Sequence, residues 1–374
     1  MKFIIAPDKL KGSLTGFEFC DAVEEGLRKV FADAVILKMP LADGGDGTME
    51  VVRHYLKGEK INVTVNDPLF RPIPASYLHS PENKSAYIEM AEASGLKLLK
   101  STELNCAQSS TYGTGELIAD ALEKGVEEII LGIGGSATND GGMGMAHALG
   151  YRFLNGKNEV LKPIGANLVE VKKVDTAKIH PKLREIKVKV ACDVANPFYG
   201  EQGAAKVYAA QKGASREEIA HLDKGLRNFA KVISNKFGID LQEIKGSGAA
   251  GGIGGGAIVF LDGSLTSGID LIKDLASFDT ALEGADWIIT GEGKLDEQTL
   301  SGKTIAGVIA SAKEKNIPVA ALCGSVEISI EQQEEFGLTY VNSIVKGVLD
   351  LQEAIATSYG NLVHASYNFA NLLK

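Results

Sequence analysis

Short apolar runs alternate with amphipathic stretches at both ends of the 374-residue chain. Near the start, Lys2–Ala6 and Ala34–Met39 have the length of buried strands, and Phe17–Val30 and Thr48–Leu56 have the apolar spacing of helices. The same alternation returns after residue 285 and continues into a C-terminal helix. It predicts the strands Trp287–Thr290, Pro318–Leu322 and Leu338–Ile344 and the helix Thr304–Asn316. Strands that alternate with helices indicate a parallel α/β layer.

The middle of the chain begins with a different pattern. Three short runs of alternating apolar and polar residues are separated by turns rich in Asn and Pro, which predicts antiparallel hairpins. These runs are Ile61–Val65, Ile73–Leu78 and Ala86–Met90. Further on, helices are predicted at Gly115–Lys124, Met143–Leu149 and Arg216–Phe237, and strands at Glu128–Ile133 and Ile186–Ala191.

These patterns predict an α/β protein with two α/β domains, because 374 residues exceed one ordinary hydrophobic core. The first domain is Rossmann-like with a mainly parallel sheet, and it combines the two ends of the chain, residues 1–62 and 281–374. The second domain, residues 63–280, is mixed and contains the antiparallel hairpins. The segment 107–150 fits either domain.

Composition narrows the class of protein. The net charge of −9 argues against a general nucleic-acid binder, which needs a basic face. The four cysteines have no paired spacing, so free thiols in a reducing cytoplasm are expected. No uncharged stretch approaches the roughly 20 residues of a membrane span, and the apolar run Phe3–Pro7 is too short for a signal peptide. We therefore expect a cytoplasmic protein without a membrane partner, of an oligomeric state that the sequence does not indicate.

A glycine-rich stretch, Gly132-Ile-Gly-Gly-Ser-Ala-Thr-Asn-Asp-Gly-Gly-Met-Gly144, lies between a predicted strand and a predicted helix. Glycines at such a turn let backbone N–H groups approach an anion closely. Polar side chains in the same loop add donors and a carboxylate. The candidate phosphate-binding residues are Gly134, Gly135, Ser136, Thr138, Asn139 and Asp140.

Acidic and basic side chains follow several other predicted strands, where open parallel sheets bind their ligands. Asp8-Lys-Leu-Lys-Gly-Ser13 follows the first strand, and its lysines are suited to phosphate or carboxylate oxygens. Asp43-Gly-Gly-Asp46 follows the second strand, and its two carboxylates suit a magnesium ion or substrate hydroxyls. Asp193 follows a third strand and is a candidate proton acceptor. For the first two, the alternative is a capping turn at the start of a helix. For Asp193 it is an ordinary Asx-turn.

Thr290-Gly-Glu-Gly-Lys-Leu-Asp296 also follows a predicted strand, and Lys303 comes shortly after it. Carboxylates for a magnesium ion and lysines for phosphate are the combination that phosphoryl transfer needs. Gly302-Lys-Thr304 resembles the end of a P-loop, but residue 297 is Glu where that loop requires Gly. The candidates here are Glu292 and Asp296 for the metal and Lys294 and Lys303 for phosphate.

The spacing Gly246-Ser-Gly248-Ala-Ala-Gly251 matches the dinucleotide fingerprint, although the residues before it are a weak strand. Gly248 and Gly251 are therefore candidates for nucleotide binding. The match keeps open an NAD-dependent oxidoreductase that acts on a hydroxy acid. A binding module for anions or nucleotides, without catalysis, is a second alternative.

The ordered set of these motifs resembles the class I glycerate kinase family over nearly the whole chain. Besides the loops above, the residues that carry the resemblance are Ser109-Ser-Thr-Tyr-Gly-Thr-Gly-Glu-Leu-Ile118 and Ala191-Cys-Asp-Val194. The resemblance implies two α/β domains with an active site in the cleft between them. It also implies phosphorylation of D-glycerate by ATP and Mg²⁺, with 2-phosphoglycerate favoured over 3-phosphoglycerate as the product.

Within that reaction, chemistry suggests roles for individual residues. Asp193 is the expected acceptor of the hydroxyl proton, with Asp8 and Lys11 as further catalytic candidates. Lys11 would neutralise the glycerate carboxylate or the transferred phosphoryl group. Asp43 and Asp46 would orient the glycerate hydroxyls, and the carboxylate roles are exchangeable with those of the metal-binding pair.

Overall fold

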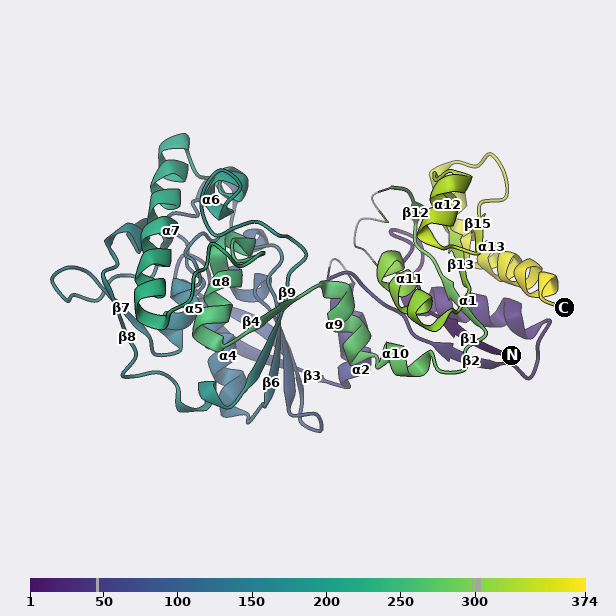
Figure 1. Cartoon of the computed structure of the whole chain (residues 1–374), viewed down its shortest axis with the longest axis horizontal. Helices are drawn as coiled ribbons and strands as arrows, with labels where there is room; N and C mark the ends of the chain where they lie inside the picture. Colours follow the sequence, from purple (N-terminus) through teal and green to yellow (C-terminus); the bar gives the residue numbers. More distant parts are fainter. Residues whose placement is uncertain (45–46, 298, 300–303) are drawn as a thin grey trace. The chain divides into compact units, whose positions relative to one another are not determined.

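The structure, a computed structural model, describes residues 1–44, 47–297, 299 and 304–374 (Figure 1). The chain divides into two compact units. The terminal unit contains Met1–Tyr55 and Gly268–Lys374, and the central unit contains Leu56–Ser267, including the whole segment 107–150. Each unit has its own sheet with helices packed on it, so the predicted α/β class is confirmed. The division into independently folding domains stays a prediction.

The terminal unit is built on a five-stranded parallel sheet with the order β15-β13-β11-β1-β2. Its strands are β1 (Lys2–Ile5), β2 (Val35–Lys38), β11 (Trp287–Thr290), β13 (Val319–Cys323) and β15 (Tyr340–Ser343), with a small pair of β12 (Lys294–Leu295) and β14 (Ser325–Val326). Its helices are α1 (Gly16–Arg28), α2 (Thr48–Leu56), α9 (Gly268–Leu275), α10 (Phe278–Ala281), α11 (Thr304–Lys315), α12 (Ile330–Phe336) and α13 (Leu351–Leu372). The sheet joins strands from both ends of the chain.

Strand order in this sheet reverses between β1 and β11. From β1 the chain crosses through α1 to β2 on one side, whereas from β11 it crosses through α11 to β13 and on to β15 on the other side. In open parallel sheets such a switch point leaves a crevice at the carboxyl ends of the strands. The residues that follow β1 and β11 therefore lie at the position where this fold binds ligands.

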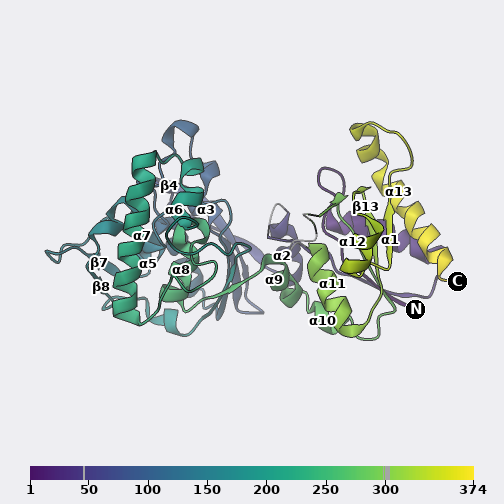
Figure 2. The ribbon, with the colours of Figure 1, turned by 45° about the horizontal axis from the view of Figure 1, so that its top comes forward.

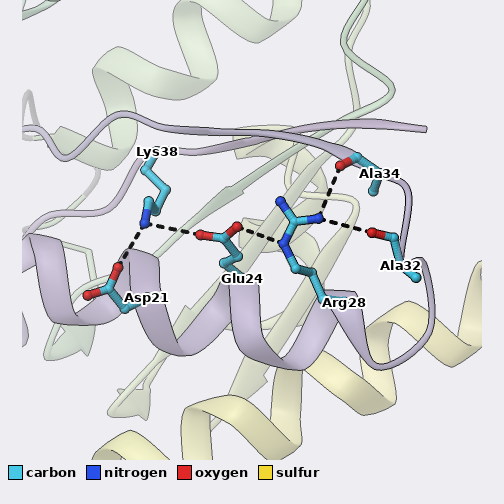
Figure 3. Close-up of polar contacts among 6 residues, drawn as sticks. All are labelled: Asp21, Glu24, Arg28, Ala32, Ala34 and Lys38. Atoms are coloured by element: carbon cyan, nitrogen blue, oxygen red, sulfur yellow. Dashed lines mark hydrogen bonds and ion pairs between the residues drawn. The ribbon is translucent and has the colours of Figure 1, made fainter.

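Helices α1 and α13 pack side by side against the sheet (Figure 2). Phe19 and Leu27 of α1 and Phe369 of α13 join Phe3 of β1 in one buried cluster. The opposite side of α1 is polar, where Lys38 Nζ lies 3.0 Å from an oxygen of Glu24 (Figure 3). Exposed ion pairs of this kind contribute little to stability, so apolar burial is what anchors α1.

The central unit has a six-stranded mixed sheet with the order β10-β9-β6-β5-β4-β3. Its strands are β3 (Glu59–Asn66), β4 (Pro72–Ser80), β5 (Ser85–Glu89), β6 (Glu128–Gly132), β9 (Lys187–Ala191) and β10 (Ser264–Thr266), and β7 (Arg152–Leu154) pairs separately with β8 (Lys173–Asp175). Strands β3, β4 and β5 are antiparallel neighbours, which confirms the predicted hairpins, whereas β5, β6, β9 and β10 are parallel.

The helices of the central unit are α3 (Ala91–Ser94), α4 (Tyr112–Glu123), α5 (Met143–Ala148), α6 (Ala204–Tyr208), α7 (Arg216–Phe237) and α8 (Ala249–Leu261), with short 3₁₀ turns that include Ala210–Lys212. A run of glycines is an unfavourable start for a helix. Ala250, Gly251 and Gly252 are indeed left-handed, but Gly254–Gly256 lie within α8. The Gly246 carbonyl, the Phe198 ring and the Gly141–Gly142 backbone approach these three glycines too closely for side chains. Among the described residues, no helix is long and apolar enough to cross a membrane.

Candidate active site

Asp8 lies at the switch point of the terminal sheet. Its backbone N–H donates to the carbonyl of Gly291 at 2.9 Å, which holds the segment after β1 beside the segment after β11. The Thr304 hydroxyl, at the first residue of α11, donates to the Asp8 carboxylate at 2.7 Å. Burial raises the pKa of Asp8 and the nearby Asp43 carboxylate adds to the rise, whereas the hydrogen bond from Thr304 opposes it. Asp8 is thus a buried carboxylate at the switch point, and the charge of Asp43 is close enough to affect it.

The two lysines after β1 lie in different surroundings. Lys9 and Asp8 line a small cavity of about 30 Å³ together with the first turns of α1 and α2, and the Lys9 ammonium lies near Gly47. Lys11 is exposed in the tight turn between Leu10 and Leu14. The sequence analysis assigned a role to Lys11 and none to Lys9. The two lysines follow the same strand, and only the structure shows that the turn places them in different surroundings.

Glu292 and Asp296, the predicted metal ligands, follow β11 on the extension that pairs β12 with β14. Burial raises the pKa of the Cys323 thiol, and the nearby Glu292 carboxylate adds to this rise. Asp296 accepts hydrogen bonds from the backbone and hydroxyl of Thr299 at 3.2 and 3.4 Å. Its other oxygen lies 3.4 Å from the Lys294 ammonium.

Lys294 itself is exposed, and its Nζ lies 2.7 Å from Oε2 of Glu327. The Glu327 carboxylate, and then that of Asp296, raise the pKa of Lys294, so this side chain stays charged. Two other candidates, Asp46 and Lys303, lie outside the described residues. Among the residues that are described, no three of the types His, Cys, Asp and Glu gather into a cluster suited to a metal ion.

The glycine loop of the central unit follows β6, at the carboxyl edge of the parallel strands. Its first part, Gly134 and Gly135, is exposed, and a side chain at position 134 would meet no other atom within 4 Å. Ser136–Asp140 is buried. The exposed part fits the close approach of an anion to the backbone that the sequence predicted.

Asp140 is fully enclosed by protein. It accepts hydrogen bonds from the backbone and hydroxyl of Thr111 at 2.8 Å each and from the N–H groups of Gly142 and Gly144 at 3.1 Å each. Burial raises the pKa of Asp140, and these four hydrogen bonds oppose the rise. The carboxylate thus ties the loop to the start of α4 and α5. This geometry does not test the predicted contact of Asp140 with phosphate. It favours a role for Asp140 in positioning the loop.

Thr138 and Asn139 follow the exposed glycines but turn inward. In the part of the chain that the structure describes, neither the Thr138 hydroxyl nor the Asn139 amide has a hydrogen-bond partner. Buried polar groups are nearly always satisfied, so these atoms indicate a bound water or ligand atom. The Ser136 hydroxyl, in contrast, accepts a hydrogen bond from the Lys212 ammonium at 2.6 Å.

The loop with the dinucleotide spacing packs directly against this glycine loop. A side chain on Gly251 would collide with the carbonyl of Thr138, and one on Gly248 with the carbonyl of Pro197. No strand precedes the spacing, since residues 238–248 form turns and bends. These glycines therefore allow two backbone segments to touch, and the strand–turn–helix context of a dinucleotide fingerprint is missing.

Asp193 is exposed in the loop that follows β9. That loop lies against the Gly246–Gly248 turn, where the Gly248 N–H donates to the Asn196 carbonyl at 3.0 Å. Because Gly251 in turn contacts Thr138, three predicted segments meet at one edge of the central sheet. The structure thus brings together Asp193, the glycine loop and the Gly248 turn, which are far apart in the sequence.

Two residues at this edge were missed by the sequence analysis. Glu89 ends β5 beside Gly132, receives a hydrogen bond from the Tyr87 hydroxyl at 3.1 Å, and has a pKa raised by burial. Lys212 is almost completely buried beneath the glycine loop. Glu89 was detectable as a carboxylate at a predicted strand end. Lys212 carries no local signal, because its position depends on packing between distant segments.

Two α/β units whose sheet edges carry acidic side chains, lysines and an exposed glycine loop are typical of enzymes that act on small phosphorylated molecules. The model of the glycerate kinase family matches residues 3–374. A glycerate kinase of Halalkalibacterium halodurans is 44% identical over 98% of this chain and 97% of its own length. The glycerate 2-kinase of Escherichia coli is 38% identical over 100% of this chain and 98% of its own length.

A crystal structure of a proposed glycerate kinase 2 from Salmonella typhimurium has the same fold, with a TM-score of 0.89 and 39% identity. The similarity covers 100% of this chain and 98% of that one. The chain belongs to the glycerate kinase family, as the resemblance predicted.

Proposed function

We propose that this protein is a cytoplasmic glycerate kinase that transfers the γ-phosphoryl group of ATP to the 2-hydroxyl of D-glycerate, with Mg²⁺ as cofactor. The observation that carries the proposal is the family match over residues 3–374, with relatives named for glycerate or glycerate 2-kinase activity over nearly their whole length. The exposed Gly134–Gly135 backbone and the acidic switch point supply the anion site and the carboxylates that such a reaction needs.

The residues present fit a magnesium ion that is shared with phosphate. Mg²⁺ in such enzymes usually takes one or two protein carboxylates and fills its remaining positions with phosphate oxygens and water. Glu292 and Asp296 remain the proposed pair, and Asp8 with Asp43 is the alternative, because their mutual repulsion favours a cation between them. When bound, the ion would neutralise the charge on the transferred phosphoryl group.

Within this proposal the chain's own residues bind and orient the reactants. The backbone of Gly134 and Gly135 would cradle nucleotide phosphates, with support from Ser136–Asp140 behind the loop. Lys294, in the terminal unit, is a separate candidate for phosphate. Lys11 and Asp43 would bind glycerate through its carboxylate and its hydroxyls. Exposed Asp193 would accept the hydroxyl proton as the nucleophile attacks. Asp8 is the alternative proton acceptor, because burial raises its pKa and a carboxylate with a raised pKa is a better general base.

Phosphorus NMR of a reaction with ATP, Mg²⁺ and D-glycerate tests the proposal in one experiment. A new phosphate-ester resonance at the position of 2-phosphoglycerate, together with ADP, is the expected result. The 3-phosphate ester would overturn the proposed position of transfer, and no ester at all would overturn the proposed kinase activity.

A parallel sample with NAD and glycerate would show reduced cofactor by absorbance if the oxidoreductase alternative were correct. Excess chelator should abolish turnover, and full activity in chelator would exclude the metal assignment.

A further inference from the structure

A buried lysine lies directly beneath the glycine loop. Lys212, in the 3₁₀ turn Ala210–Lys212, is only 3% exposed. Its ammonium donates to the Ser136 hydroxyl at 2.6 Å and to the Thr138 carbonyl at 2.8 Å. Both partners belong to the loop, and neither is a carboxylate. An ammonium removed from water is costly, so a protein that retains one here has a use for its charge or its hydrogen bonds.

The turn that carries Lys212 is fixed by contacts of its own. The Lys212 carbonyl accepts a hydrogen bond from the N–H of Cys106 at 3.1 Å, and the Cys106 thiol lies 3.7 Å from the Ala209 carbonyl. These bonds attach the turn to the interior of the central unit. The position of the ammonium is therefore set by the turn that carries it. The ammonium can hold the loop in place, because its own position does not depend on the loop.

Hydrogen bonds hold the glycine loop at two places, on either side of the Thr138 and Asn139 side chains. Asp140 binds Thr111 and the start of α5, whereas Lys212 binds Ser136 and Thr138. The exposed glycines at 134 and 135 lie before these points. Between the points lie the buried side chains of Thr138 and Asn139, which have no hydrogen-bond partner among the described residues. A loop held in this way presents its glycine N–H groups in one conformation, which lowers the entropic cost of binding a phosphate.

We propose that Lys212 is a positioning residue for nucleotide binding: its ammonium holds Ser136 and Thr138 so that the glycine loop is preformed for phosphate, and its charge attracts the anion through the loop. This inference rests on the proposed function. It assigns no direct contact between Lys212 and the nucleotide, since loop residues cover the ammonium.

The charge of Lys212 gives the proposal a second, independent readout. Burial lowers the pKa of Lys212 to about 8, and the nearby Asp140 carboxylate only partly opposes this. Burial, with Glu218 nearby, raises the pKa of Cys106 to about 11, so that thiol stays neutral at pH 9. Below pH 8 the lysine is charged, and above it the charge is lost. Affinity for nucleotide should thus fall between pH 7.5 and 9.5, a range in which phosphate groups with a pKa of about 6 are already ionised.

The experiment measures the dissociation constant of MgATP by calorimetry, and the KM values for ATP and glycerate, in the full-length protein. Lys212→Met should weaken MgATP binding roughly ten- to hundredfold, the effect of losing hydrogen bonds to a charged donor. It should raise KM for ATP and leave KM for glycerate within about twofold. Lys206→Met is the matched control, because Lys206 is on the preceding helix and pairs with the exposed Glu201. It should match the wild type.

Rescue and pH dependence separate positioning from general stabilisation. Lys212→Arg keeps its charge at high pH, so it should restore binding at least in part and remove the fall in affinity above pH 8. Unchanged MgATP affinity in Lys212→Met, or equal rises in both KM values, would overturn the proposal.

If neither variant folds, hydrogen exchange of Ser136–Asp140 in the wild type tests the proposal instead. After correction for intrinsic rates, faster exchange at pH 9.5 than at 7.5 supports the proposal, and no change refutes it. A wild type that neither binds MgATP nor phosphorylates glycerate would instead refute the proposed function.

Discussion

Replacing Gly251 with alanine should damage the glycine loop without touching any proposed catalytic side chain. Gly251 has a φ of +76°, and a Cβ there would lie 2.8 Å from the Asn139 Cα and collide with the Thr138 carbonyl. Non-bonded carbon atoms need roughly 3.5–4.0 Å, so the loop around Thr138 must move by about 1 Å. The change thus tests whether the contact between the two loops sets the loop conformation.

The free-energy cost has two parts. A left-handed backbone costs an alanine about 1–2 kcal/mol, and forced displacement of a packed segment costs about 1–3 kcal/mol more. Gly238→Ala isolates the first part, because Gly238 ends α7 with a φ of +74° and a Cβ there would meet no other atom within 4 Å. Both glycines belong to the central unit, so the two variants form a matched pair.

Urea unfolding followed by circular dichroism, with peptide-resolved hydrogen exchange, gives the change in unfolding free energy of each variant. Gly251→Ala should lose about 2–5 kcal/mol and Gly238→Ala about 1–2 kcal/mol. Only Gly251→Ala should also weaken MgATP binding and speed exchange in Ser136–Asp140. Equal losses of stability in the two variants, or normal MgATP affinity in Gly251→Ala, would refute the idea that this contact shapes the loop.

Three further predictions concern single side chains. Asp193→Asn should slow single-turnover phosphoryl transfer roughly 10²–10⁴-fold at saturating substrates, and normal transfer with a loss in Asp296→Asn would move the base role elsewhere. Lys11→Ala should reduce glycerate affinity or turnover at an unchanged melting temperature, and if Lys9→Ala does so instead, the lysine that lines the small cavity is the ligand. Burial lowers the pKa of His147 to about 4, so the folded protein keeps it neutral while the unfolded chain takes up a proton below about pH 6.5. Stability should therefore fall from pH 6.5 towards 4, less so in His147→Gln, and identical urea midpoints against pH in both proteins would contradict this origin.

Much of the secondary structure follows from local patterns. Thr48–Leu56, Arg216–Phe237 and Trp287–Thr290 begin and end where the sequence predicted. The two helices each have one buried side, whereas the strand is a short run whose last three residues are all buried. Ser215 and Glu218 form a capping box at the start of α7.

Elements defined by packing were harder to predict. The Gly254–Gly256 stretch has a low helix propensity, yet it is helical at a place where the Gly246 carbonyl, Phe198 and the Gly141 backbone approach too closely for any side chain. Strand β12 has only two residues and exists because β14 lies beside it. Neither feature has a local cause, so no window of sequence predicts it.

For the candidate site, the sequence by itself determined which chemical groups are available: carboxylates and lysines after strands, and a glycine loop before a helix. It also identified the family, because an ordered set of such motifs is specific. Only the tertiary structure decided which of these groups face solvent and which face protein. Asp140 and Lys212 both became internal supports of the loop, while Gly134 stayed exposed. The physical reason is that burial and hydrogen bonding depend on contacts between segments distant in sequence, and local spacing does not encode those contacts.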